Sequence, residues 1–514
     1  MKYRLLVLIL SVHMLAGALP LSPSAKQEAE LFTTFLQAAY AQRSGSPQRF
    51  ALLRKALKQA PNSAYLKQQI VAEALAVDVP ELAKPYLDFI EDNPQDPDAW
   101  VVYGAYHVQQ GNMEQAIEAY EKALSLDPDD ERILSQYINV LGYAYPQKAA
   151  QTLTELAISY PLAAPMFYTE IGRLYMYHQN YPLALEALNK AISLDGTMPE
   201  PRALRAGVYE KTNQYFLMLH ELEELEKMGY ATAQTYAQMG SIFILVQDYA
   251  RAEETFLKAK TLEPGNKVAG YFLSLLAEKR GEYSRAVSYL KETSDYASSP
   301  TKQVQVSYYQ RKLNQPKASF HTLKRAYKHF PDNAEVAYLY GVALYENKKY
   351  RQTAQVLAPW VEKSPTQEDI RLQYAFALEG QQKYGAMEEQ LGILLEQNPR
   401  NAAALNLYAY SLALRGQRLE EAAEYIARAL AVWPEDNSFM DTQAWVFYRQ
   451  SKYAQALDIV EGISPEILTA NPEMAYHAGV IYAVNGQSDL AKHYLQLAAE
   501  GGWKDAKKEL RKYK

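Results

Sequence analysis

Cysteine is absent from the 514 residues of this chain. Its absence excludes structural disulfides, thiolate nucleophiles, cysteine-ligated zinc sites and iron–sulfur clusters. It also excludes the lipidated cysteine by which bacterial lipoproteins are anchored. The fold therefore has to be stabilised without covalent cross-links.

Charge of one sign is not concentrated anywhere, and catalytic motifs are missing. The 53 basic and 59 acidic residues are interspersed and give a net charge of −6, so nucleic acid is not expected as a partner. The segment "HELEELE" at 220–226 lacks the second histidine of a zinc metalloprotease. The segment "DPDDER" at 127–132 lacks the alternating ligands and the glycine of a calcium loop. We therefore expect no enzyme activity, no metal and no cofactor.

Long apolar runs are also missing, apart from one at the N-terminus. In "MKYRLLVLILSVHMLAGALPLSPSA", Lys2 and Arg4 precede an apolar run that is shorter than the ~20 residues of a membrane-spanning helix. This pattern predicts a signal peptide over residues 1–25, cleaved after Ala18 or Ala25. An uncleaved anchor in the inner membrane is the alternative. The lack of any Asn-x-Ser/Thr sequon suits export to a bacterial periplasm.

The sequence does contain a spacing that recurs every 34 residues. Steps of 12, 16, 19 and 24 residues from Gly104 reach Ala116, Tyr120, Ala123 and Pro128, and the same offsets hold from Gly172, Gly240 and Gly479. The first three of these glycines lie 68 residues apart, which is two periods. The fourth lies seven periods and one residue further on, and we attribute this drift to an extra residue in the loop "RGQR" at 415–418. A chain of this length is expected to form several domains or a repeat array, and the spacing favours the array.

The offsets describe two facing helices. Trp100, Tyr103 and His107 are three and four residues apart and form one stripe of a first helix. The small residues Gly104 and Ala116 let that helix approach a second, antiparallel one, and Tyr120 fills the gap beside them. Because helices of this length are marginal in water by themselves, each pair has to stack on its neighbours.

A period of 34 with Trp, Gly, Tyr, Ala, Phe or Tyr, Ala and Pro at these offsets resembles the tetratricopeptide repeat (TPR). About fourteen units fit between residues 30 and 505, and the stretch 405–457 is similar to tandem repeats of many bacterial exported proteins. The resemblance implies an all-α fold, an α-α superhelical solenoid of about fourteen tandem TPR hairpins.

The expected organisation has five parts. They are a signal peptide at 1–25, degenerate N-terminal TPR units at 26–96, a first part of the solenoid at 97–300, a C-terminal part with an aromatic concave face at 301–505, and a basic tail at 506–514.

Tyrosine outnumbers phenylalanine by 42 to 14, and a ring with a polar tip suits half-buried surfaces and recognition. In TPR proteins the first helix of each pair lines a concave groove in which partners bind. On this implied face we place ten candidate partner-binding residues: Tyr338, Tyr345, Phe376, Asn406, Tyr410, Asp441, Trp445, Tyr448, Arg449 and Tyr476. Such a face suits an extended peptide or an amphipathic helix. The alternative is that the rings pack between adjacent repeats.

The family's chaperone-binding carboxylate clamp requires cations on this face. The corresponding positions hold Val101 and Ala105, Ala237 and Ser241, or Tyr338 and Val342, so a chaperone's C-terminal carboxylate is not expected as a partner.

The function these features favour is a non-catalytic protein–protein interaction scaffold in the bacterial periplasm, serving envelope assembly, secretion or polysaccharide export. Two alternatives remain open: an assembly factor anchored in the inner membrane, and a carbohydrate-binding solenoid whose rings stack on sugar faces.

Overall fold

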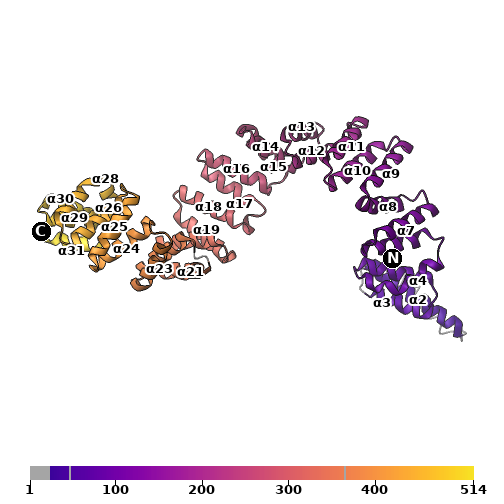
Figure 1. The fold of residues 1–514 in the computed structure, drawn as a ribbon, viewed down its shortest axis with the longest axis horizontal. Coiled ribbons are helices and arrows are strands. Elements are labelled where there is room, and N and C mark those ends of the chain that lie inside the picture. Colours follow the sequence, from indigo (N-terminus) through magenta and orange to yellow (C-terminus); the bar gives the residue numbers. More distant parts are fainter. Residues whose placement is uncertain (1–22, 45–47, 364–365, 514) are drawn as a thin grey trace, which may run out of the picture. The chain divides into compact units, whose positions relative to one another are not determined.

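The computed structural model describes residues 23–44, 48–363 and 366–513, and every regular element in these ranges is a helix (Figure 1). The predicted all-α fold is therefore confirmed. The expected signal peptide lies almost wholly outside the described residues. Contacts divide the chain into two compact units, Met1–Thr235 and Tyr236–Lys514. The division expected between residues 300 and 301 falls at the first residue of α18 (Pro300–Lys312), within the second unit.

The first unit is a series of antiparallel helix pairs. Its helices are α2 (Pro23–Ser44), α3 (Arg49–Gln59), α4 (Ala64–Ala76), η1 (Pro80–Leu82), η2 (Lys84–Tyr86), α5 (Phe89–Asp92), α6 (Pro97–Gln109), α7 (Met113–Leu126), α8 (Glu131–Ala144), α9 (Pro146–Ser159), α10 (Ala164–Tyr177), α11 (Tyr181–Leu194), α12 (Pro199–Lys211) and α13 (Tyr215–Lys227). In place of a full second helix, α4 is followed by the short helices η1, η2 and α5.

The second unit continues the same arrangement. Its helices are α14 (Ala233–Leu245), in which the division falls, α15 (Tyr249–Leu262), α16 (Lys267–Lys279), α17 (Tyr283–Glu292), η3 (Tyr296–Ser298), α18, α19 (Pro316–His329), α20 (Ala334–Glu346), α21 (Tyr350–Lys363), α22 (Glu368–Gly380), α23 (Tyr384–Gln397), α24 (Ala402–Arg415), α25 (Leu419–Val432), α26 (Asn437–Arg449), α27 (Tyr453–Gly462), α28 (Pro465–Ala470), α29 (Pro472–Val484), α30 (Ser488–Glu500), α31 (Lys504–Glu509) and η4 (Leu510–Tyr513). The segment predicted as a basic tail is helical here, and Ala506 of α31 is fully buried.

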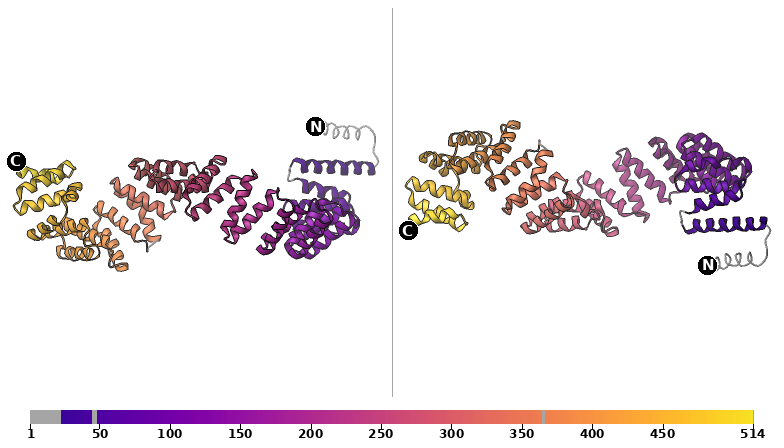
Figure 2. Two further views of the ribbon diagram at one scale, coloured as in Figure 1. Left: turned by 90° about the horizontal axis from the view of Figure 1, so that it is seen from above. Right: turned by 90° about the horizontal axis from the view of Figure 1, so that it is seen from below.

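Each first helix packs against the second helix of its own pair and against the first helix of the next pair. In the first unit α10 contacts α11 and α12, and in the second unit α24 contacts α25 and α26. Figure 2 shows the paired helices from two further sides. Each unit is therefore a solenoid of stacked hairpins. Counting α4 with its short helices, the described residues form fourteen hairpins, as predicted.

The turn inside the hairpins has a conserved backbone geometry along the chain. After α6, Gly111 has a φ of 75°, its N–H donates to Val108 O at 3.0 Å, and the N–H of Asn112 donates to His107 O at 2.9 Å. This is a Schellman motif, which satisfies the last carbonyl groups of a helix. Left-handed residues recur at Gln179, Asn213, Gln247, Gly281, Asn314, Lys348, Gln382, Gly416, Ser451 and Gly486.

These left-handed positions locate the irregularities of the period. The step from Gly281 to Asn314 is one residue short of 34, and the steps from Gly416 to Ser451 and from Ser451 to Gly486 are each one residue longer. The loop "RGQR" is indeed lengthened, and Arg418 in it is left-handed as well, with a φ of 50°. The one-residue drift is therefore the net result of three changes rather than of that loop alone.

The small residues of the repeat sit where two backbones approach. A Cβ atom added to Gly240 of α14 would lie 2.6 Å from Cε1 of Phe256 of α15, and one added to Gly172 would lie 2.5 Å from Leu188 Cδ2. Phe256 and Leu188 are both fully buried. The predicted pairing of a small residue with a large one sixteen positions later is confirmed at these hairpins.

Candidate interaction surface

The ten candidate residues all lie on first helices of the second unit. Tyr338 and Tyr345 are on α20, Phe376 on α22, Asn406 and Tyr410 on α24, Asp441, Trp445, Tyr448 and Arg449 on α26, and Tyr476 on α29. Because α22 contacts α24, α24 contacts α26 and α26 contacts α29, these helices form one continuous layer.

A first group of side chains links helices that are two repeats apart. We call Tyr345, Phe376, Glu379, Tyr410 and Glu473 the carboxylate–tyrosine cluster. The hydroxyl of Tyr410 on α24 donates a hydrogen bond to Glu473 on α29, so this bond passes over α26. The rings of Tyr345 and Phe376 lie 5.9 Å apart. The cluster thus combines two carboxylates with three aromatic rings on one face.

The charge of this cluster is not neutralised from within. Glu379 makes no hydrogen bond or ion pair with any described residue, and burial together with the nearby Glu473 raises its pKa. Burial and the charge of Glu379 raise the pKa of Tyr345 to about 12. Burial and the charge of Glu473 also raise the pKa of Tyr410. These shared shifts mark one weakly solvated, negatively charged neighbourhood.

The helix ends explain why the two carboxylates differ. Glu473 lies in the first turn of α29, where the free N–H groups favour negative charge, and its own N–H is capped by Asn471 Oδ1 at 2.9 Å. Glu379 is the penultimate residue of α22, where the helix carbonyl groups disfavour a carboxylate. Glu379 is therefore the less stabilised carboxylate of the cluster.

A second group of side chains forms a row of rings, which we call the aromatic ladder: Trp445, Tyr448, Tyr476, His477 and Trp503. Trp445 stacks on His477 of the next repeat, with ring centroids 4.1 Å apart, and on Tyr448 at 4.9 Å. Tyr476 lies 5.9 Å from Trp503. Burial raises the pKa of Tyr476 to about 12.

Asp441 lies beneath the aromatic ladder. Its Oδ2 is 2.9 Å from His477 Nδ1, and both side chains are buried. Asp441 and Trp445 are each only 5% exposed. These two candidates therefore serve packing between adjacent repeats, while Tyr448 and Tyr476 remain half-buried.

Several polar atoms on this face are buried without a hydrogen-bond partner among the described residues. They are Asn406 Oδ1, Asp441 Oδ1, Trp445 Nε1 and Trp503 Nε1. A buried polar atom without a partner costs about 1–3 kcal/mol, so such atoms mark a place where a bound molecule can supply the missing partner.

Two candidates lie apart from both groups. The guanidinium of Arg449 donates to Leu414 O at 2.9 Å, close to the end of α24, where a cation stabilises the helix. Tyr338 is half-buried on α20, and burial and the charge of Asp369 raise its pKa.

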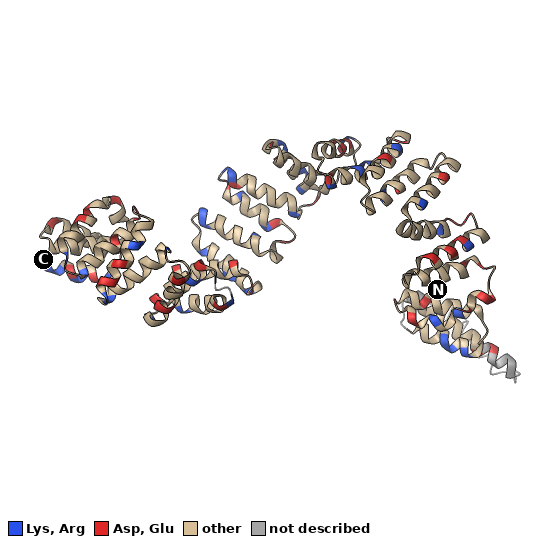
Figure 3. Ribbon diagram, in the orientation of Figure 1, with Lys and Arg blue, Asp and Glu red and all other residues tan. Residues whose placement is uncertain are grey.

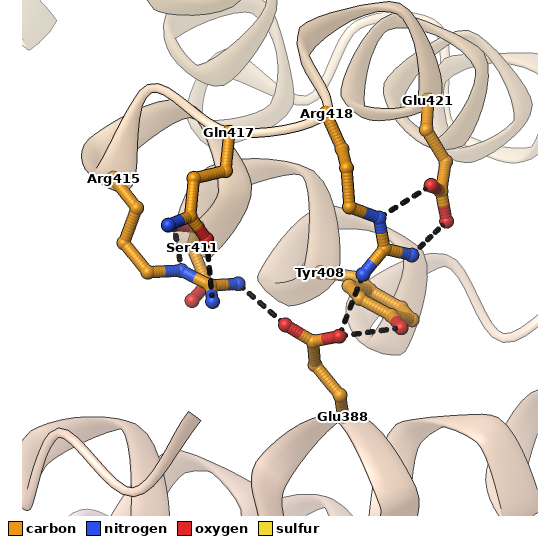
Figure 4. A network of polar contacts seen from close by, with 7 residues as sticks. All are labelled: Glu388, Tyr408, Ser411, Arg415, Gln417, Arg418 and Glu421. Carbon is orange, nitrogen blue, oxygen red and sulfur yellow. Dashed lines mark hydrogen bonds and ion pairs between the residues drawn. The ribbon is translucent and has the colours of Figure 1, made fainter. Parts of the chain in front are cut away.

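The arginines nearest to the carboxylate–tyrosine cluster are engaged elsewhere. Arg415 Nη2 donates to Glu388 Oε1 at 2.6 Å, and Arg418 Nη1 donates to Glu388 Oε2 at 2.7 Å (Figure 4). Arg418 also pairs with Glu421, and the hydroxyl of Tyr408 donates to Glu388. This network connects α23, α24 and the loop before α25. Elsewhere basic and acidic side chains are interspersed along the described chain (Figure 3).

The first unit contains a separate apolar groove between α8, α9 and α10. Its volume is about 1100 Å³. Its lining includes the exposed side chains of Tyr143, Tyr160, Met166 and Tyr177. None of these residues was predicted as a site, because the repeat pattern assigns them no position.

The sequence also missed four residues of the second unit: Glu379, Glu473, His477 and Trp503. The available signal was weak, since a carboxylate at a helix end usually faces solvent. No group of three or more His, Asp or Glu residues in the described ranges could hold a metal ion. In the same ranges, no helix combines the length and apolar character needed to cross a membrane.

Family models match several segments of the chain. The model described as the TPR domain of cytochrome c-type biogenesis protein H matches residues 56–159. Two tetratricopeptide repeat models match residues 233–266, and residues 308–368, 377–437 and 411–466. The matched segments lie in both units.

Two curated proteins are similar over part of the chain. The TPR repeat-containing protein PA4667 of Pseudomonas aeruginosa is 29% identical over 194 residues, which are 37% of this chain and 32% of that protein. The human protein O-mannosyl-transferase TMTC1 is 24% identical over 202 residues, which are 37% of this chain and 21% of that protein. The similarity thus spans about a third or less of either relative.

Solved structures with similar helices include a tetratricopeptide repeat protein from Parabacteroides merdae, with 14% identity, a TM-score of 0.37, and 54% of this chain and 97% of that chain covered. They also include YrrB, described as a TPR protein with an unusual peptide-binding site, with 19% identity, a TM-score of 0.33, and 37% and 97% covered. TPR proteins bind other proteins or peptides. The recurrent hairpins and the matching repeat models identify this chain as a tetratricopeptide repeat protein.

Proposed function

We propose that this chain is a non-catalytic scaffold of the bacterial cell envelope that binds peptide segments or amphipathic helices of other proteins. The binding surface is the layer of first helices from α20 to α29. The observation that carries the proposal is the concentration there of aromatic rings and of buried polar atoms without partners, such as Asn406 Oδ1 and Trp503 Nε1. Rigid rings give large contact areas at a low cost in entropy, and polar atoms fix the register of a bound chain.

The envelope location is supported by two independent features. The first is the N-terminal sequence, with its basic start, apolar run and Ala18 or Ala25 at the end. The second is the match of residues 56–159 to a TPR domain of a cytochrome c-type biogenesis protein. We infer that the scaffold serves the assembly of other envelope proteins.

Site-specific photo-crosslinking in cells tests the binding surface. A photoreactive phenylalanine analogue at Asn406, which is half-buried on α24, is expected to give a discrete adduct with another protein. The same analogue at Glu424, which is exposed on α25, is the matched control and is expected to give none. The adduct should disappear when Phe376 and Tyr410 are both replaced by alanine. Equal labelling from both positions, or an adduct that survives the double replacement, would contradict the proposal.

Mass spectrometry of the mature protein tests the location. A mature N-terminus near Leu19 or Lys26 in the soluble periplasmic fraction is the expected result. An intact N-terminus in the membrane fraction would favour the anchored alternative, and a cytoplasmic protein with an intact N-terminus would contradict both.

A further inference from the structure

We propose that the carboxylate–tyrosine cluster binds a cationic side chain, lysine or arginine, of the partner protein, with its charged head between Glu379 and Glu473. This inference rests on the proposed function, because it names the chemistry of the partner that the scaffold would hold. It also assigns a role to two residues that the repeat pattern leaves without one.

The first argument is the absence of an internal cation. Glu379 is half-buried and lies at the unfavourable end of α22, and no described residue forms an ion pair or a hydrogen bond with it. Arg415 is directed to Glu388, and Arg449 is bonded to a backbone carbonyl group. A half-buried carboxylate without a counter-ion is costly, so the site is strongly selective for a positive charge.

The second argument is the type of polar atom that lacks a partner beside the cluster. Asp441 is 95% buried by its 5% exposure, its Oδ2 faces His477, and its Oδ1 has no donor among the described residues. The charge of Asp441 acts on the hydroxyl of Tyr410, which places this carboxylate next to the cluster. Asn406 Oδ1 lacks a donor as well. Both are acceptors, and ammonium and guanidinium groups carry donors only.

The third argument is the aromatic surface of the cluster. Tyr345 and Phe376 are half-buried, with ring centroids 5.9 Å apart and planes inclined by 56°. Ring faces attract cations, and the attraction grows where water is excluded. Carboxylates, acceptor atoms and rings therefore select the same chemical group.

The occupant we infer is a side chain of a protein rather than a free amine. The aromatic ladder continues the same face from α26 through Trp503, and it offers contact area that only the neighbouring residues of a peptide can use. An anionic peptide is disfavoured by Glu379, Glu473 and Asp441 together.

Calorimetric titration of the full-length protein with defined peptides tests this inference. The probe is the blocked peptide Gly-Tyr-Arg-Tyr-Gly, and its control carries citrulline, which keeps the shape of arginine without the charge. We expect the arginine peptide to bind about tenfold or more tightly than the citrulline peptide, since a charge-assisted pair is at stake. The changes Glu379→Gln and Glu473→Gln should each weaken the arginine peptide severalfold. Glu389→Gln alters an exposed glutamate of α23 and should leave binding unchanged.

Each other outcome overturns the inference. Equal binding of the two peptides, no binding of the arginine peptide at concentrations of about 1 mM, or insensitivity to Glu379→Gln would remove the cation from the site. Argininamide that binds as tightly as the peptide would show a small-amine site instead. If the photo-adduct at Asn406 persists in Glu379→Gln, the scaffold function stands and only its cationic chemistry fails.

Discussion

Tyr410 of α24 donates a hydrogen bond to the carboxylate of Glu473 of α29, 63 residues further along the chain. The bond connects first helices two repeats apart, whereas the packing contacts of the solenoid connect neighbouring helices. It therefore fixes the spacing of the first helices around α26. The same bond holds one carboxylate in place while Glu379 remains without a partner.

Replacing Tyr410 by phenylalanine removes this bond and keeps the ring. We expect the free energy of unfolding of the second unit to fall by about 1 kcal/mol, because the half-buried carboxylate of Glu473 loses its donor. Urea denaturation followed by tryptophan fluorescence measures the change. Tyr453→Phe is the control, because that hydroxyl is exposed and bonds only to Ser451 Oγ at 3.4 Å. Equal stability of wild type and Tyr410→Phe would refute the role assigned to the bond.

Replacing Glu379 by glutamine should stabilise the protein in a pH-dependent way. The pKa of Glu379 is raised above its ordinary value of 4.5, chiefly by burial. The native state then holds this proton more tightly than the unfolded state, so stability falls as pH rises through the raised pKa. Melting temperatures of wild type and Glu379→Gln are expected to agree near pH 4 and to diverge toward pH 7, with the variant higher. Glu389→Gln should show no such divergence, and a variant less stable than wild type at pH 7 would contradict the prediction.

Two glycines of the second unit should respond oppositely to alanine. In Gly240→Ala the new Cβ would lie 2.6 Å from Phe256 Cε1, so overpacking should cost about 1–3 kcal/mol. In Gly392→Ala nothing lies within 4 Å of the new Cβ, so the higher helix propensity of alanine should add about 0.5–1 kcal/mol. Chemical denaturation of both variants gives the two signs, and the same sign for both would show that hairpin approach does not limit this position.

The turn after α16 gives a test of backbone strain. Gly281 has a φ of 75°, a region that is unfavourable for β-branched residues. Gly281→Val is expected to cost about 1–2 kcal/mol. Gly281→Asn should cost less than half of that, because Asn213 and Asn314 adopt φ of 57° and 56° in the same motif. Thermal denaturation of the pair measures the difference, and equal losses would argue against left-handed strain as the cause.

The sequence by itself determined the hairpin and its repetition. The pairing of Gly240 with Phe256, the glycine in the turn at Gly111 and the register of about 34 residues are local, because they relate positions within one hairpin or between adjacent ones. A period of that kind leaves its pattern in the residue types. It also placed the aromatic residues of α20 to α29 on the first helices.

Only the tertiary structure decided which of those residues are available and what surrounds them. Trp445 and Asp441 are buried because the next repeat supplies His477 as a partner, and Glu379 is left unpaired because Arg415 is directed to Glu388. Tyr410 reaches Glu473 because the stacking of hairpins brings together helices that are two repeats apart. Such relationships depend on the geometry accumulated over several repeats, and no short-range pattern encodes them.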